Sequence, residues 1–208
     1  MSDLLPPRDA IDIVRSLPHL AHDEAQLILV TGKRGSGKTW LIREWAQRLE
    51  PRALYLDIYR SFPDVEVATS LEAALEDLAY WEACRRRVLA PRLGTREWFE
   101  YALRRILEHP LRDCLVVLDE VTKFIRTQSQ SDALEEFVLQ GRQLGLRAIV
   151  GCQVIQMIPR LMLSEGTTLI SFRVTRPRDK DVLAEWGGPE AAELAPQLTR
   201  GRALEIML

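Results

Sequence analysis

Eight residues near the start of the chain combine glycines, a lysine and a hydroxyl at the spacing of a phosphate-binding loop. They are Gly32, Lys33, Arg34, Gly35, Ser36, Gly37, Lys38 and Thr39, which fit the pattern GxxxxGK[ST]. Glycines let successive backbone N–H groups converge on phosphate oxygens, and the following helix adds the positive end of its dipole. The lysine then reaches the β- and γ-phosphates, while the threonine hydroxyl ligates Mg²⁺. The sequence therefore predicts a site for a nucleotide with Mg²⁺.

The segments on either side of this loop have the patterns that a phosphate-binding loop requires. Leu27 to Val30 is a continuous apolar run, typical of a strand buried on both faces of a parallel sheet. After the loop, apolar residues recur at helical spacing, at Leu41, Ile42, Trp45, Ala46 and Leu49. We therefore expect a strand, the loop and a helix in direct succession.

A second apolar run, Cys114 to Leu118, ends in the acidic pair Asp119 and Glu120. We predict that Asp119 holds Mg²⁺ through its water shell and that Glu120 polarises the water that attacks the γ-phosphate. Two acids after a strand are common on their own. Downstream of a phosphate-binding loop, in a chain that alternates strands and helices, they indicate the second half of a nucleotide site.

Gln153 follows another apolar run, Leu146 to Cys152. An amide at the end of a neighbouring strand can touch both the γ-phosphate and the attacking water, so this residue is a candidate sensor of the bound nucleotide. The alternative is a polar residue that ends a strand and hydrogen-bonds a loop.

Apolar runs and helical patterns alternate along the whole chain, which predicts one α/β domain over residues 1–208. We expect a mostly parallel central sheet with helices on both faces, and a helical N-terminal extension at 1–25. Strands are predicted at 26–31, 52–57, 65–67, 114–118, 146–152, 167–174 and 201–208. Helices are predicted at 8–17, 70–88, 96–108, 132–144, 179–186 and 189–197.

Five arginines lie near the break between the helices predicted at 70–88 and 96–108. They are Arg85, Arg86, Arg87, Arg92 and Arg96. We interpret them as a solvated helix end. The alternative is a contact with a phosphate backbone or with another subunit.

Composition excludes several other classes of protein. The formal net charge is −2, so any DNA contact must come from a local patch or from a pore lined by several subunits. The N-terminus lacks the pattern of a signal peptide, and no apolar stretch is long enough to span a bilayer, so we expect a cytoplasmic location. Cysteines at 84, 114 and 152 show no metal-binding spacing and are predicted to be reduced core residues.

The motifs taken together resemble the FtsK/HerA superfamily of hexameric DNA-pumping ATPases. The resemblance covers residues 26–208 and includes the Ser171–Asp179 and Gly201–Leu204 stretches. It implies a P-loop NTPase of the ASCE (RecA-like) type, in which the Gln153 strand lies between the loop strand and the Asp119 strand. The 25 residues before the first motif leave no room for a membrane segment or a barrel domain. The chain therefore looks like the genome-packaging ATPases of tailless, membrane-containing viruses.

The resemblance also implies partners and a further catalytic group. We expect a homo-oligomeric ring that drives double-stranded DNA into a capsid, with contacts to capsid or viral membrane proteins, in the host cytoplasm or the virion. The ring needs an arginine finger, for which we favour Arg178 and then Arg176, with Arg173 in the same cluster. Arg126 and the loop at 127–131 could face the pore or could be a solvent-exposed connector.

Two other functions remain open at this point. A nucleotide kinase also uses a phosphate-binding loop, and the Arg85–Arg96 region could imitate its arginine-rich lid, although Glu120 beside Asp119 suits water activation better. The third possibility is an NTP-driven switch or secretion accessory protein that does not act on DNA.

Overall fold

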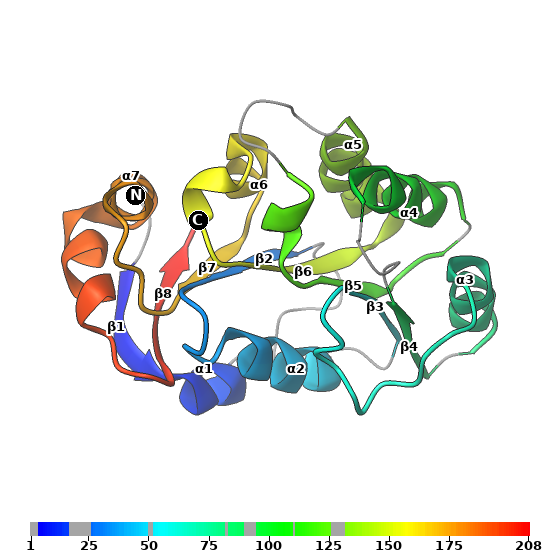
Figure 1. Cartoon of the computed structure of the whole chain (residues 1–208), viewed down its shortest axis with the longest axis horizontal. Coiled ribbons are helices and arrows are strands. Elements are labelled where there is room, and N and C mark those ends of the chain that lie inside the picture. Colours follow the sequence, from blue (N-terminus) through cyan, green and yellow to red (C-terminus); the bar gives the residue numbers. More distant parts are fainter. Residues whose placement is uncertain are drawn as a thin grey trace.

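Within the residues that the structure describes, namely 4–16, 26–49, 52–81, 83–89, 95–109, 111–125 and 132–208, eight strands of this computed structural model form one sheet (Figure 1). The strands are β1 (Leu4–Asp9), β2 (Leu27–Thr31), β3 (Arg52–Asp57), β4 (Cys84–Leu89), β5 (Leu115–Leu118), β6 (Arg147–Cys152), β7 (Thr168–Ser171) and β8 (Arg202–Met207). The α-helices are α1 (Ala10–Ser16), α2 (Lys38–Leu49), α3 (Leu71–Tyr80), α4 (Arg96–Glu108), α5 (Asp132–Gly141), α6 (Arg160–Ser164) and α7 (Pro177–Leu194). Short 3-10 helices are η1 (Val121–Lys123), η2 (Arg142–Leu144), η3 (Ile155–Met157) and η4 (Ala195–Gln197).

The strand order confirms the predicted arrangement of the nucleotide-binding strands. It is β1-β8-β7-β2-β6-β5-β3-β4, so β6 lies between β2 and β5. All neighbouring pairs from β7 to β4 are parallel, whereas β8 runs antiparallel to both β7 and β1. The carboxyl ends of β2, β6, β5 and β3 therefore meet at one edge of the sheet, and the segments that follow them lie side by side.

The strands alternate their side chains between two hydrophobic cores, as the period of two in a strand requires. On one face, Ile28 and Val30 of β2 pack with α1 and α2, where Trp45 is fully buried. On the other face, Leu27 and Leu29 pack with a core to which α3, α4, α5, α6 and α7 contribute. Helices thus cover both faces, and burying each large apolar side chain stabilises the fold by about 1.5–3 kcal/mol.

The helix predicted at 70–88 is wrong in its second half. The helix α3 ends at Tyr80, and residues Cys84–Leu89 form β4, a parallel strand at the edge of the sheet beside β3. The arginines at 85–87 are not a solvated helix end, because Arg86 bonds Asp77 at 2.6 Å and Arg87 lies buried. None of these three lines the nucleotide cavity described below. Arg92 lies outside the described residues.

The N-terminal part of the chain is not simply a helical extension. Residues Leu4–Asp9 form β1, which pairs with β8 and so adds a strand to the main sheet, and of the described residues 4–16 only those of α1 are helical. The strand β1 contains two proline residues, so the sequence pattern did not predict a strand here. The prolines are tolerated because β1 is an edge strand.

Other predictions have mixed outcomes. Two helices were predicted at 179–186 and 189–197, and α7 (Pro177–Leu194) is indeed divided in two by non-helical backbone at Gly188, with φ 81° and ψ 168°. The segment at 65–67 forms only an isolated bridge, from Val67 to Arg87. The three cysteines are free and buried, as predicted. Arg126 and the loop at 127–131 lie outside the described residues.

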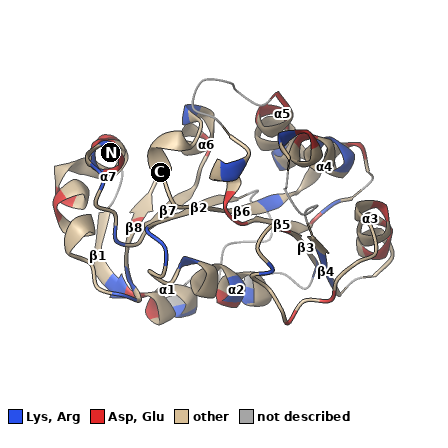
Figure 2. Cartoon of the chain, in the orientation of Figure 1, with Lys and Arg blue, Asp and Glu red and all other residues tan. Residues whose placement is uncertain are grey.

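Charged residues are spread over the described part of the chain (Figure 2). Basic and acidic residues are interspersed on the helices of both faces (Figure 2). None of the helices among the described residues combines the length and the apolar character that crossing a bilayer requires.

Candidate nucleotide site

The loop between β2 and α2 has a backbone that only glycine adopts without strain. Gly32, Gly35 and Gly37 have φ values of 145°, 77° and 116°. A β-carbon at Gly32 would lie 2.6 Å from the Cβ of Phe172, and one at Gly37 would lie 3.2 Å from the Phe172 ring. The glycines therefore serve both the tight turn and the close approach of the segment after β7.

Backbone hydrogen bonds hold this loop against the neighbouring strands. The N–H of Lys33 donates to the carbonyl of Arg173 at 3.0 Å, and the N–H of Gly201 donates to the carbonyl of Ser36 at 3.1 Å. The loop is thus tied by backbone hydrogen bonds to the segment that follows β7 and to the residue that precedes β8.

Lys38 lies at the start of α2 with its ammonium turned into the loop. Its Nζ donates to the carbonyl of Gly32 at 2.7 Å and to that of Lys33 at 3.3 Å. Burial lowers the pKa of Lys38, whereas the nearby charges of Glu120 and Asp119 oppose that change. The lysine and the acidic pair are therefore close enough to interact electrostatically, as the sequence motifs predict.

Asp119 follows β5 and packs against β6. A β-carbon at Gly151 would lie only 2.6 Å from its Oδ1, so the absence of a side chain at Gly151 makes room for this carboxylate. The pKa of Asp119 is raised to about 6, mainly by burial and then by the charge of Glu120, while Lys38 and a hydrogen bond from the Ser61 side chain lower it. A buried carboxylate beside a second acid, Glu120, suits a site that a cation completes.

Glu120 has a strained backbone, with φ 60° and ψ 47°. Such left-handed geometry costs a non-glycine residue about 1–3 kcal/mol and clusters at functional sites. Its Oε1 accepts hydrogen bonds from the Thr122 hydroxyl and, at 3.3 Å, from the backbone N–H of Gln153. The carboxylate is therefore held in one orientation beside the end of β6.

A cavity of about 580 Å³ joins these residues. Its lining consists of Arg34, Gly35, Lys38, Thr39, Tyr59, Ser61, Asp119, Glu120 and Gln153. The structure thus brings together the predicted phosphate, metal, base and sensor residues. Tyr59 and Ser61 were missed by the sequence reasoning. The signal that could have found them is their place just after a predicted strand, because the ends of parallel strands form ligand sites.

The three candidate arginine fingers do not line this cavity. Arg173, Arg176 and Arg178 are exposed, and Arg176 stands at the N-terminal cap of α7. Their exposure leaves the guanidinium groups accessible to another molecule.

The residues of the cavity fit a triphosphate with Mg²⁺. The loop offers backbone N–H groups at the N-terminus of α2, and Lys38 supplies a cation. Thr39 and Asp119 supply oxygen ligands, which Mg²⁺ prefers, and Mg²⁺ is usually bound by one or two carboxylates together with substrate phosphates.

The strand order and this cavity define a P-loop ATPase of the ASCE type. A family model confirms the class independently of the geometry. The chain belongs to the AAA domain family, whose model matches residues 21–158. No curated protein matches the chain significantly.

Solved structures with the same fold include two viral packaging proteins. The genome packaging NTPase B204 from Sulfolobus turreted icosahedral virus 2, in complex with ATPγS, has a TM-score of 0.73 at 17% identity, over 88% of this chain and 97% of that one. B204, the DNA-packaging ATPase from Sulfolobus turreted icosahedral virus, has a TM-score of 0.67 at 17% identity, over 89% and 97%. The pCW3 conjugation coupling protein TcpA has a TM-score of 0.59 at 15% identity, over 89% of this chain and 58% of that one.

Proposed function

We propose that the protein is an ATP-hydrolysing motor subunit that moves double-stranded DNA, and that its task is the packaging of a viral genome into a capsid. The observation that carries the proposal is that one cavity is lined by Lys38, Thr39, Asp119, Glu120 and Gln153 together. The fold shared with B204 over almost the whole of both chains supports the packaging role.

The proposed chemistry assigns one task to each side chain. The loop N–H groups and Lys38 bind the β- and γ-phosphates, and Thr39 with Asp119 would hold Mg²⁺. When bound, Mg²⁺ would offset the negative charge that develops on the phosphates. Glu120 accepts a proton from the attacking water, and Gln153 orients that water and senses the γ-phosphate.

The exposed arginines support a ring in which neighbours complete one another's sites. Arg178, or failing that Arg176, would reach the γ-phosphate of the adjacent subunit, because neither lines the cavity of its own chain. The DNA contact would come from a pore lined by several subunits, since the net charge of −2 offers no overall attraction. Capsid or viral membrane proteins would be further partners, and the protein would act in the host cytoplasm or the virion.

The test is phosphate release measured with and without duplex DNA, together with the mass in solution by light scattering. We expect ATP to promote a closed oligomer and DNA to stimulate hydrolysis by that oligomer. A protein that stays monomeric with ATP and DNA would contradict the motor function. Hydrolysis that ignores duplex DNA in an assembled ring would favour an NTP-driven switch, and transfer of phosphate to a nucleoside monophosphate would favour a kinase.

A further inference from the structure

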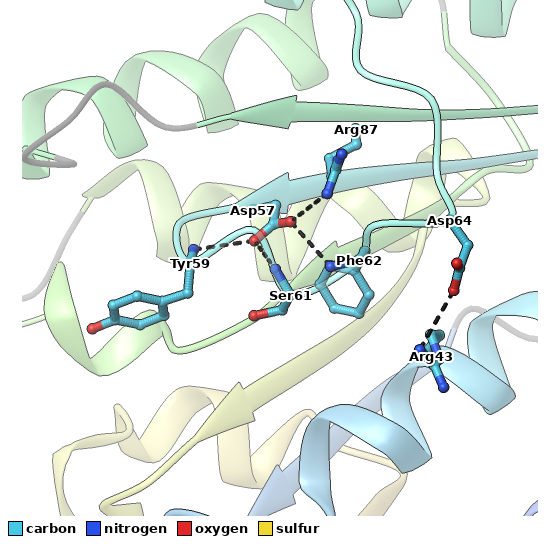
Figure 3. Close-up of polar contacts among 7 residues, drawn as sticks. All are labelled: Arg43, Asp57, Tyr59, Ser61, Phe62, Asp64 and Arg87. Atoms are coloured by element: carbon cyan, nitrogen blue, oxygen red, sulfur yellow. Dashed lines mark hydrogen bonds and ion pairs between the residues drawn. The ribbon is translucent and has the colours of Figure 1, made fainter.

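The loop after β3 is folded around a buried carboxylate (Figure 3). Asp57, which ends β3, is 1% exposed, and its two oxygens accept three backbone N–H groups. The donors are Tyr59 at 3.1 Å and Ser61 at 2.9 Å, both to Oδ1, and Phe62 at 3.2 Å to Oδ2. A carboxylate bonded by several N–H groups gives a short loop one strongly preferred conformation.

Two further contacts fix this loop from the side of the sheet. The guanidinium of Arg87, from the edge strand β4, lies 3.5 Å from Oδ2 of Asp57 (Figure 3). The ring of Phe62 is fully buried, with its centroid 5.0 Å from that of Tyr55. The ion pair therefore fixes the segment 57–62 at its first residue, and the buried Phe62 ring fixes it at its last.

Two other side chains of this loop lie at the nucleotide cavity. Tyr59 and Ser61 line that cavity together with Asp119, and the Ser61 side chain is near enough to Asp119 to lower the pKa of its carboxyl group. The ammonium of Lys123, from η1, lies 4.5 Å above the Tyr59 ring. The parallel register pairs Leu56 with Leu118, so Asp57 and Asp119 follow at adjacent positions on neighbouring strands.

A loop that served only to connect β3 with α3 would need none of this order. Its backbone groups could be solvated at the surface, as those of most connections are. Here a buried ion pair and three hydrogen bonds place one hydroxyl beside the carboxylate that is predicted to hold the metal. Burying the charges of Asp57 and Arg87 costs desolvation free energy, which is consistent with a functional need to fix the position of that hydroxyl.

We propose that Ser61 is a positioning residue that orients Asp119 toward Mg²⁺, and that Asp57, paired with Arg87, holds Ser61 in place. The inference rests on the proposed function, because it concerns the same Mg²⁺–nucleotide centre. Ser61 acts through Asp119 and is not assigned a contact with the reacting atoms.

The experiment compares Ser61→Ala with the unaltered full chain by calorimetric binding of ATPγS, once with Mg²⁺ and once with EDTA. Alanine retains the backbone N–H that Asp57 accepts, so the loop keeps its fold while the hydroxyl is lost. We expect affinity with Mg²⁺ to fall about tenfold, as the loss of a hydrogen bond to a charged group implies, and affinity in EDTA to stay unchanged. Ser61→Thr keeps a hydroxyl and should restore most of the loss.

Asp64→Asn is the matched control on the same loop. Asp64 is exposed and pairs with Arg43 of α2 at 3.4 Å, away from the cavity lining (Figure 3). This variant should bind ATPγS as the unaltered chain does. Asp57→Asn weakens the ion pair with Arg87 and the hydrogen bonds from the loop, and it should reproduce the Mg²⁺-dependent loss of affinity of Ser61→Ala.

Two results would overturn the inference alone. One is Mg²⁺-dependent affinity in Ser61→Ala equal to that of the unaltered chain, and the other is an equal loss with Mg²⁺ and with EDTA. If the unaltered chain itself gained no affinity from Mg²⁺, the proposed function would fail, and the inference would fall with it.

Discussion

The backbone N–H of Gln153 donates to Oε1 of Glu120 at 3.3 Å, so the residue predicted to sense the nucleotide also binds the residue predicted to activate water. The two residues lie at the ends of adjacent strands, β6 and β5. A shift of the β6 end on nucleotide binding would therefore move the carboxylate of Glu120 directly. This contact gives a physical route from sensing the γ-phosphate to the catalytic base.

Glu120→Gln should keep nucleotide binding and abolish turnover. The amide oxygen of the new side chain can still accept from Gln153, but it cannot take a proton from water. We expect phosphate release to fall by about 10²–10⁴-fold, the usual contribution of a general base, with ATPγS affinity little changed. Phosphate-release kinetics and calorimetry check both halves, and undiminished hydrolysis would remove Glu120 from its assigned role.

Gly151→Ala should disturb Asp119 without replacing any of the predicted ligands. The added methyl would lie 2.6 Å from Oδ1 of Asp119 and 2.9 Å from Cδ1 of Ile42, so one of them must move. We expect a loss of about 1–3 kcal/mol in stability and weaker binding of Mg²⁺–ATPγS.

Gly141→Ala is the control for that substitution. Gly141 ends α5 with helical backbone angles, and its added methyl would meet only Leu146 at 3.7 Å, an ordinary contact. It should leave binding unchanged and stabilise the fold by about 0.4–1 kcal/mol, because alanine has less freedom in the unfolded chain. Equal behaviour of the two variants in urea unfolding and in binding would contradict our reading of Gly151.

Asp119→Asn should stabilise the nucleotide-free protein at neutral pH. The pKa of Asp119 is raised from 3.8 to about 6 in the fold, so the neutral form is favoured and ionisation costs stability as the pH rises through about 6. The difference corresponds to about 3 kcal/mol at pH 7.5 and should vanish well below pH 3.8, where the carboxyl group is neutral in both the folded and the unfolded chain. Urea midpoints at several pH values test this, and a gain that is independent of pH would argue against it.

Arg178→Ala should remove turnover while leaving ATPγS binding by the isolated chain intact. The side chain is exposed and does not line its own subunit's cavity, so its charge would be felt only by a neighbour. We expect a fall of about 10³–10⁵-fold, typical of an arginine finger. Arg176→Ala should show a smaller effect, and Arg104→Ala, an exposed position on α4, none.

Mixing subunits tests whether that arginine acts between chains. In a mixed ring, an Arg178→Ala subunit can provide Glu120 while a Glu120→Gln neighbour provides the arginine. Partial recovery of phosphate release is the expected result. Two inactive variants that stay inactive when mixed would speak against a finger supplied by the neighbour.

Much of the nucleotide site could be predicted because its signals are local in the chain. The apolar run from Leu27, the glycines and the helical spacing of Leu41, Ile42 and Trp45 are all contained in one short segment. These three signals agree with one another, because a strand, a glycine loop and a helix in succession are what a phosphate-binding loop requires. The acidic pair at 119–120 was equally clear, since a buried strand ends immediately before it.

The edge strands could not be predicted in the same way. In β4, Arg85–Arg87 looked like a charged helix end, but Arg86 bonds Asp77 of α3 and Arg87 bonds Asp57 of β3. Edge strands tolerate such charge, and the partners that neutralise it come from other elements. In β1, pairing with β8 at the far end of the chain outweighs the unfavourable local presence of proline.

The sequence by itself determined the phosphate loop, the acidic strand end and the alternating order of strands and helices. Each of these features depends on residues that lie close together in the chain. Only the tertiary structure decided which strand ends become neighbours. It places Ser61 beside Asp119 and Gln153 beside Glu120. These pairs are distant in the chain, and they meet because parallel strands in the order β6-β5-β3 bring their carboxyl ends to one edge of the sheet.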